Sequence, residues 1–238
     1  MILLPAIDMK DGNAVRLKKG DFNEVTVYSH DPSEIASEFE KSGAGFIHLV
    51  DLDGALAGHS VNETAIKKIT STVSVPCELG GGIRSLDAIE YVLGLGVYRA
   101  ILGTSAVQDP GFVSEAVKKF GAERIVVGID AKNGMVATHG WEKLSDITAV
   151  DMAMDMKRRG VKTIIYTDIS RDGMLTGPNV EQTKKLSDYT GLDIIASGGV
   201  SCMDNLKELC DAGIYGSIIG KAYYEKKVDL KEAVELFS

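Results

Sequence analysis

The sequence is poor in the residue types from which disulfide-rich proteins and metal proteins are built. Its 238 residues include only three cysteines and four histidines. Cys77, Cys202 and Cys210 form no C-x-x-C pair, and the histidines show no H-x-x-x-H spacing. We therefore expect neither a disulfide framework nor a metal site, and we expect the cysteines to behave as small buried apolar residues.

Long apolar runs and an excess of positive charge are also missing. No stretch approaches the roughly 18 apolar residues that span a bilayer. The N-terminal stretch MILLPAIDMKDG has neither the length nor the basic start of a signal peptide. The formal net charge is −8, which disfavours a nucleic-acid surface. These absences predict a cytoplasmic protein whose partners include neither membrane nor nucleic acid.

Short strand-like runs and helical segments alternate along the chain. One helical start is explicit in Asp31-Pro32-Ser33-Glu34, with an N-cap, a proline at the first helical position and a glutamate three residues after the cap. Such alternation implies parallel βαβ units, and eight of them predict a single (β/α)₈ barrel spanning 1–238. The strand-like runs are 2–8, 46–53, 74–79, 99–103, 124–130, 163–169, 192–197 and 216–220, and the clearest helical segments are 33–44, 85–96, 111–121, 148–160 and 203–213.

An internal repeat runs through the chain at an offset of 117 positions. The segment GVYRAILGTSA at 96–106 aligns without a gap with GIYGSIIGKAY at 213–223. We predict two half-barrels of four βα units each, at about 1–120 and 121–238. Only the first strand is out of step, and five extra residues are therefore expected in the long loop VRLKKGDFNEVTVYSH that follows it.

Glycine-rich turns occupy matching places in the two halves, ELGGGIRS at 78–85 and IASGGVSC at 195–202. Each follows the third strand of its half, and a further glycine follows the fourth strand. Loops after barrel strands share one face, and a glycine turn entering a helix presents N–H groups that suit a phosphate. The candidates are Gly81, Gly82, Arg84, Gly103, Thr104 and Ser105 in the first half, and Gly198, Gly199, Ser201, Gly220 and Lys221 in the second. We predict a ligand with two phosphates, although turn geometry alone would also explain either turn.

Two aspartates end corresponding strands of the two halves. Asp8 ends the first strand and Asp130 the fifth, and in each strand the residues two and four positions earlier share the same face. We expect this face to point into the barrel and the two carboxylates to face each other across its mouth. One would serve as base and the other as acid. The alternative is that each caps a helix or pairs with a lysine.

Other polar residues near strand ends are weaker candidates. Asp172 competes with Asp130 as the acid, and Thr167 is a plausible hydroxyl contact. Asp51 and Asp168 are related by the repeat, and they either hydrogen-bond the substrate or brace the barrel.

Three further side chains are candidates for contact with a ligand, and each has an ordinary structural alternative. His48 is out of phase with Asp51 and is expected to face the helices. Trp141 lies in a polar loop after the fifth strand, where it would stack on a flat heterocycle or cap the barrel mouth. Arg16 supplies a cation from the long first loop, or is an ordinary solvated charge.

Seven motifs give the chain a resemblance to a known family along its full length. LLPAIDMKDGNAVRL, HLVDLDGA, ELGGGIRS, GIDAKNG, TDISRDGMLTGPN, ASGGVS and IIGKAYYE resemble the ProFAR isomerase family of histidine biosynthesis and occur in the family's order. The resemblance implies an Amadori rearrangement of an aminoaldose phosphate to an aminoketose. The substrate would carry a phosphate at each end, and no metal or organic cofactor would be required.

Carried onto this sequence, the family's base falls on Asp8 and its proton donor on Asp130. Asp172 is the competing acid, with Thr167 nearby and Gly173 beside it in the substrate site.

Three other functions were considered. The related cyclase subunit of imidazole glycerol phosphate synthase shares the repeat, but its first strand carries a cysteine where this chain has Ala6-Ile7-Asp8. An isomerase that also accepts phosphoribosylanthranilate, from tryptophan biosynthesis, would use the same carboxylates. A non-catalytic sugar-phosphate-binding barrel is disfavoured, because a mere binder has little reason to aim carboxylates at an anion. A monomer is expected.

Overall fold

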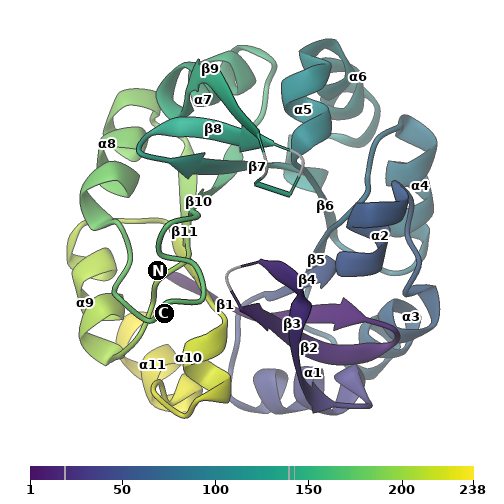
Figure 1. Cartoon of the computed structure of the whole chain (residues 1–238), viewed down its shortest axis with the longest axis vertical. Helices are drawn as coiled ribbons and strands as arrows, with labels where there is room; N and C mark the ends of the chain where they lie inside the picture. Colours follow the sequence, from purple (N-terminus) through teal and green to yellow (C-terminus); the bar gives the residue numbers. More distant parts are fainter. Residues whose placement is uncertain (19, 139, 142) are drawn as a thin grey trace.

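Eight parallel strands close into a barrel within the part of the chain that the structure describes, as the sequence predicts (Figure 1). This computed structural model describes residues 1–18, 20–138, 140–141 and 143–238. The barrel order is β10-β11-β12-β1-β4-β5-β6-β7, and pairing of β7 with β10 closes it. The barrel strands are β1 (Ile2–Lys10), β4 (Ile47–Asp51), β5 (Cys77–Gly80), β6 (Arg99–Leu102), β7 (Ile125–Lys132), β10 (Thr163–Asp168), β11 (Asp193–Ser197) and β12 (Gly216–Ile219).

Helices surround the barrel (Figure 1). The first begins as predicted, with Pro32 at its first position and the Asp31 carboxylate accepting a hydrogen bond from the Ser33 backbone N–H at 3.2 Å. The helices are α1 (Pro32–Lys41), α2 (Leu52–Ala57), α3 (Glu63–Thr72), α4 (Leu86–Gly94), α5 (Thr104–Gln108), α6 (Pro110–Phe120), the 3₁₀ turn η1 (Ala122–Arg124), α7 (Ala149–Arg158), α8 (Val180–Thr190), α9 (Met203–Asp211), α10 (Lys221–Tyr224) and α11 (Leu230–Phe237). Among the described residues, none of these helices has the length and apolarity to cross a membrane.

The hydrophobic core has two parts, because each barrel strand buries both of its faces. The larger part lies between the strands and the surrounding helices. The smaller part fills the inside of the barrel and consists of Leu4, Ala6, Ile101, Val126, Ile165, Ile195 and Ile218. Leu4, Ala6 and Val126 belong to the strand faces that the sequence assigned to the interior, so the predicted alternation of β1 and β7 is confirmed.

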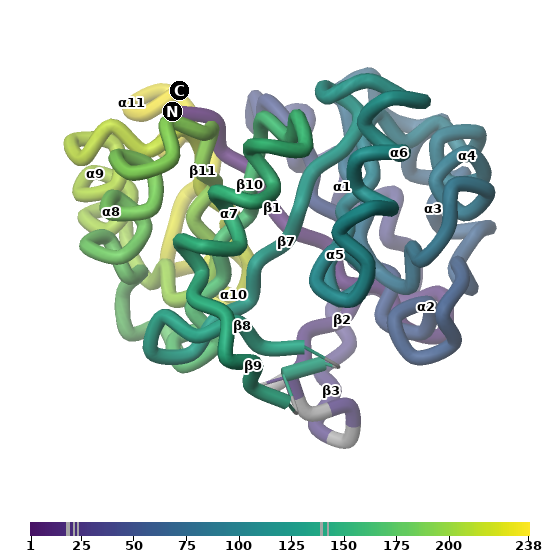
Figure 2. The backbone as a smooth tube through the Cα atoms, turned by 90° about the horizontal axis from the view of Figure 1, so that it is seen from above, coloured from purple at the N-terminus to yellow at the C-terminus, as the bar shows by residue number. Residues whose placement is uncertain are grey.

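Two β-hairpins extend the strands that carry the candidate aspartates, where the sequence predicted loops. β1 continues into β2 (Asn13–Lys18) and β3 (Asp21–Ser29), and β7 continues into β8 (Met135–Thr138) and β9 (Lys143–Thr148). Both begin with a tight turn of two left-handed residues, Asp11-Gly12 and Asn133-Gly134, which is the preferred hairpin geometry. Figure 2 shows both hairpins projecting from one end of the barrel, opposite the termini.

The five extra residues of the first half lie inside its hairpin. The two tight turns, at Asp11 and Asn133, are 122 positions apart. The N-cap residues of the following helices, Asp31 and Thr148, are 117 positions apart. The offset therefore changes between these points, within the stretch that the sequence identified. The division of the chain into two half-barrels stays a prediction.

The glycine turns pack tightly against the backbone of the preceding loops. Gly82 has φ +73°, and a Cβ there would overlap the Gly54 carbonyl oxygen. Gly199 has φ +90°, and a Cβ there would overlap the Gly177 carbonyl oxygen. The doubled glycines thus have a geometric requirement in both halves, whether or not a ligand is bound.

We expect Gly199→Ala to lower the free energy of unfolding by about 3 kcal/mol, because the added methyl group needs both an unfavourable φ and a displaced backbone. Gly213→Ala is the matched control: its φ is +73°, but nothing lies within 4 Å of the added Cβ. This variant should lose only about 1 kcal/mol. Urea unfolding of both variants measures the difference, and equal losses would contradict the packing argument.

Candidate active site

Asp8 lies at the barrel mouth in an ion pair with Arg16. An Arg16 nitrogen is 2.9 Å from Asp8 Oδ2, and the side chains of Arg16 and Asp8 are only 13% and 15% exposed. Burial raises the pKa of Asp8, the Arg16 charge opposes this shift, and the nearby Asp172 adds to it. Arg16 comes from β2, so the first hairpin folds back over the strand that it extends. The prediction of a cation near the site is supported, and Arg16 is not a solvated surface charge.

Asp130 lies two residues before the end of β7, and its hydrogen-bond partners are neutral. The Trp141 indole N–H donates a hydrogen bond to Asp130 Oδ2 at 2.9 Å, and Thr167 also hydrogen-bonds this carboxylate. Burial raises the pKa of Asp130, and these two hydrogen bonds oppose the shift only in part. Trp141 comes from the second hairpin, where its φ of +75° is rare for a bulky side chain. Its indole also packs on Gly20 of the first hairpin.

Asp172 follows β10 and is close enough to act electrostatically on both carboxylates. Its charge raises the pKa of Asp8 and of Asp130, after burial in each case. The mouth therefore gathers three carboxylates, and Arg16 acts on two of them, Asp8 and Asp172. Among the described residues, no three His, Cys, Asp or Glu side chains are grouped so as to hold a metal ion. That the site uses no metal or cofactor stays a prediction.

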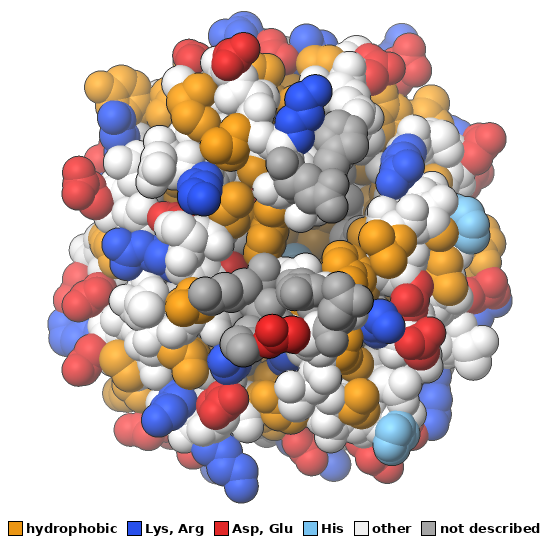
Figure 3. All heavy atoms as spheres, viewed as in Figure 1, with side chains coloured by type: hydrophobic (Ala, Val, Ile, Leu, Met, Phe, Trp, Pro, Cys, Tyr) orange, Lys and Arg blue, Asp and Glu red, His pale blue; other side chains and the backbone are white. Residues whose placement is uncertain are grey.

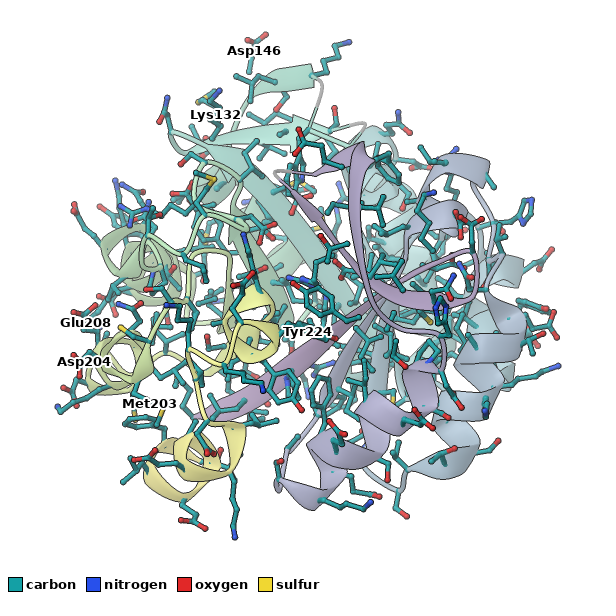
Figure 4. The ribbon with its side chains drawn as sticks, turned by 60° about the horizontal axis from the view of Figure 1, so that its bottom comes forward. Lys132, Asp146, Met203, Asp204, Glu208 and Tyr224 are labelled. Atoms are coloured by element: carbon teal, nitrogen blue, oxygen red, sulfur yellow. The ribbon has the colours of Figure 1, made fainter. Side chains whose placement is uncertain are left out.

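Aromatic side chains form one wall beside Arg16. The Tyr224 hydroxyl donates to the Ala6 carbonyl at 2.9 Å, and the Tyr28 and Tyr224 rings have centroids 4.5 Å apart. Figure 4 shows Tyr224 on α10, turned toward β1. A Cβ at Gly220 would overlap the Arg16 guanidinium, so this glycine leaves the space that the arginine occupies. The same face of the molecule is hollowed over the barrel centre (Figure 3).

The glycine candidates lie at the ends of neighbouring strands in each half. Gly81, Gly82 and Gly103 follow β5 and β6, and Gly198, Gly199 and Gly220 follow β11 and β12. Gly103 and Gly220 share almost the same backbone, with φ −101° and ψ −109° against φ −99° and ψ −110°.

The polar candidates beside these glycines have protein partners. The Ser105 hydroxyl donates to the Ile83 carbonyl at 2.9 Å, and Lys221 Nζ donates to the Gly173 carbonyl at 3.2 Å. Ser201 bonds Asn205, and Thr104 opens α5. Arg84 is exposed and donates to the Ala55 carbonyl at 3.1 Å, at the end of α2.

Asp51 is not available to a substrate, which corrects its place among the predicted binding residues. Its side chain is fully buried, and its two oxygens accept hydrogen bonds from Gly54 N, Ser60 Oγ, Val61 N, and both the backbone and the side-chain nitrogen of Asn62. Asp168 has the corresponding role, accepting from Ser170 and from Asn179 Nδ2. Of the two alternatives, the structure supports the brace.

His48 lies inside the barrel, and the prediction that it faces the helices is wrong. It pairs in register with Ala6, an interior residue of β1, and its charge acts on both Asp8 and Asp130. Asp51 is the residue that points outward. The prediction assumed that Asp51 points into the barrel, and alternation along β4 then places His48 on the opposite face.

Two asparagines at equivalent positions of the repeat are absent from the predicted site. Asn62 and Asn179 are 117 positions apart, and each donates its amide N–H to the brace aspartate of its half, at 2.7 and 2.6 Å. Asn62 also accepts from the Gly12 backbone N–H at 2.8 Å, which ties the first hairpin to the loop after β4. Asparagine-to-aspartate spacing compared between the halves would have found both.

Buried carboxylates at the mouth of a (β/α)₈ barrel are typical of an enzyme active site. The profile of the family described as "Histidine biosynthesis protein" matches residues 2–229. The chain belongs to this family, and it is an isomerase of histidine biosynthesis.

Curated relatives align with essentially the whole chain. A protein of Lachnoclostridium phytofermentans is 59% identical over 237 residues, covering 100% of this chain and 99% of its own. Proteins of Bacillus cereus and Syntrophomonas wolfei are 52% and 50% identical, covering 99% and 98% of this chain and 98% and 97% of their own. All three are named 1-(5-phosphoribosyl)-5-((5-phosphoribosylamino)methylideneamino) imidazole-4-carboxamide isomerase.

We expect Asp130→Asn to raise the free energy of unfolding at pH 7 by about 1 kcal/mol. Because the folded-state pKa of Asp130 is raised, its contribution to stability is present below the unfolded-state pKa and is lost as the pH rises through the folded-state pKa. Asparagine carries no charge, so the advantage of the variant should shrink as the pH is lowered toward 4.

Urea unfolding across this pH range measures the effect. Asp146→Asn is the control, since Asp146 is exposed on β9 and points away from the molecule (Figure 4). A destabilised Asp130→Asn at neutral pH would contradict the account of the buried charge.

Proposed function

We propose that this isomerase converts ProFAR, phosphoribosylformimino-aminoimidazole carboxamide ribotide, to its phosphoribulosyl isomer by general acid–base catalysis. The observation that carries the proposal is the pair of largely buried carboxylates, Asp8 and Asp130, on strands from opposite sides of the barrel. The printed name of the relatives, with its two phosphoribosyl groups, supports this substrate.

The surroundings of the two aspartates support different roles. Asp8 has a guanidinium 2.9 Å away, which favours the ionised form that a base requires. The hydrogen-bond donors to Asp130 are neutral, and its burial, which outweighs these donors and the charge of His48, favours the protonated form that an acid requires. Burial raises the pKa of both carboxyls, and only that of Asp8 is opposed by a neighbouring guanidinium. A difference of this kind between two carboxylates is typical of acid–base pairs.

The reaction would begin at the ribose ring of the aminoaldose. The acid protonates the ring oxygen, and the ring opens to an iminium ion whose positive charge lies next to C2′. Asp8 then removes the C2′ proton, and the electron pair moves to neutralise the iminium. The resulting enolamine tautomerises to the ketose. Each general acid or base step contributes about 10²–10⁴-fold to the rate.

The two glycine regions would hold the two phosphates. Gly103 and Gly220 cap short helices with matching backbone, which supports two equivalent cradles on either side of the carboxylates. Lys221 and Arg16 lie near the Gly220 cradle and would add positive charge. Trp141 and the tyrosine wall would flank the planar carboxamide heterocycle.

Asp8→Asn should lower kcat on ProFAR by at least about 10²-fold, because the amide cannot remove a proton. Its affinity for the substrate should change little. Turnover of the purified wild type is measured on ProFAR and, separately, on phosphoribosylanthranilate. Urea unfolding of the variant checks that it folds.

Turnover of ProFAR alone supports the proposal. Turnover of both substrates would replace it with the bifunctional isomerase, and turnover of neither would favour a sugar-phosphate-binding barrel. A variant that no longer folds would assign Asp8 a structural role.

Asp130→Asn should lower kcat on ProFAR by about 10²-fold or more, and Asp172→Asn should lower it less, because Asp130 is the carboxyl on the strand facing Asp8. Rates of both variants at saturating substrate measure the contrast. The opposite order would make Asp172 the acid and leave Asp130 with the role of holding Trp141.

A further inference from the structure

Three polar side chains occupy the inside of the barrel beneath the carboxylates. His48, Glu78 and Arg99 stand on β4, β5 and β6, where His48 is paired in register with Glu78, and Glu78 with Arg99. His48 Nδ1 is 2.6 Å from Glu78 Oε1, and Arg99 Nε donates to Glu78 Oε2 at 2.7 Å. The Arg99 guanidinium lies over the Phe46 ring, 4.2 Å from its centroid. We call these three residues the interior relay.

The fold does not require the interior relay. At the offset of 117 the same three positions are Ile165, Ile195 and Gly216. They keep the same register, Ile165 with Ile195 and Ile195 with Gly216, and the two isoleucines belong to the apolar interior cluster. Replacing a buried ionic group by well-packed apolar residues is often neutral or stabilising. A charged layer retained on one side only therefore points to a task other than stability.

Glu78 is placed to set the orientation of the imidazole. It is fully buried. Burial raises its pKa, but the hydrogen bonds and charges of His48 and Arg99 outweigh this and hold the pKa below its usual range. An ionised carboxylate only accepts hydrogen bonds, so the ring nitrogen that faces it, Nδ1, carries a proton. Arg99 balances the charge of Glu78 from below.

The other ring nitrogen is left for a ligand. In the described part of the chain, Nε2 of His48 has no hydrogen-bond partner, and the side chain is 12% exposed. The ring is near enough to Asp8 and Asp130 to act electrostatically on both. Nε2 is thus free to bind a ligand, and the ring lies in the barrel interior one strand step below the position of Asp8.

We propose that His48 contacts the substrate through Nε2, by hydrogen bonding a ribose hydroxyl between Asp8 and Asp130, and that Glu78 and Arg99 are positioning residues that hold the imidazole in this orientation. The assignment rests on the proposed function for the identity of the ligand. The contact would fix the sugar carbon chain so that its C2′ proton stays within reach of Asp8, which is a positional gain rather than a proton transfer.

The repeat supplies the decisive variant. A triple variant gives the first half the residues that the second half has at the equivalent positions: His48→Ile, Glu78→Ile and Arg99→Gly. We expect the urea midpoint of this triple variant to equal or exceed that of the wild type, and its turnover of ProFAR to fall by at least about 100-fold. Full turnover in a folded triple variant would overturn the proposal.

Single variants decide the matter even if the triple variant fails to fold. In Glu78→Gln the amide can donate as well as accept, so the Nδ1–H form is no longer selected. Nitrogen NMR of the His48 ring should show one tautomer in the wild type and a mixture in Glu78→Gln. Its kcat should fall at least about tenfold with KM nearly unchanged. Ile195→Val, at the position matching Glu78, is the control and should leave the ring spectrum and kcat unaltered.

Two outcomes separate this proposal from the proposed function. Wild-type protein that does not turn over ProFAR would overturn the function, whereas the ring spectrum still reports the orientation of His48 without substrate. Addition of ProFAR should shift the Nε2 resonance. An unshifted resonance in an enzyme that does turn over ProFAR, or an unchanged tautomer in Glu78→Gln, would overturn the relay alone.

Discussion

The pairing of β7 with β10 closes the sheet, and the arrangement of the polar groups depends on that closure. In a closed parallel barrel every strand ends at the same rim, and alternate side chains must point inward. β1 and β7 are separated by β4, β5 and β6 along one side of the ring, so Asp8 and Asp130 come from opposite sides of the barrel. Closure also buries them, which raises the pKa of both carboxyls.

The barrel itself could be predicted from sequence because its signals are local and repeated. Strand alternation predicts the inward faces of β1 and β7, and cap residues such as Asp31 predict where long helices begin. Short elements escape this reasoning. The helices α2, α5 and α10 have six, five and four residues, too few to display a helical period. The hairpins had a readable signal, the Asp-Gly and Asn-Gly turns, which was not used.

The site was predictable only where a residue's strand position decides its role. Asp8 and Asp130 lie where alternation puts them. Asp51 does not, because it belongs to the outward face of β4 and serves as the N-cap of α2. Alternation counted from Asp51 therefore predicts the wrong face for His48. The pairing of His48 with Ala6 comes from neighbouring strands, and a single sequence does not contain that register. Ion pairs such as Arg16 with Asp8 likewise depend on how a hairpin folds back.

The two hairpins are structurally separate from the barrel strands that carry Asp8 and Asp130. Each extends directly from the strand of a candidate aspartate, so the strand's own hydrogen-bonded neighbours in the barrel hold the aspartate while the hairpin beyond it varies. The first is five residues longer than the second between matching turns and N-caps, and both aspartates still lie two residues before the ends of their strands. The length and sequence of a hairpin can therefore change while the barrel strands keep the aspartate beneath it in place.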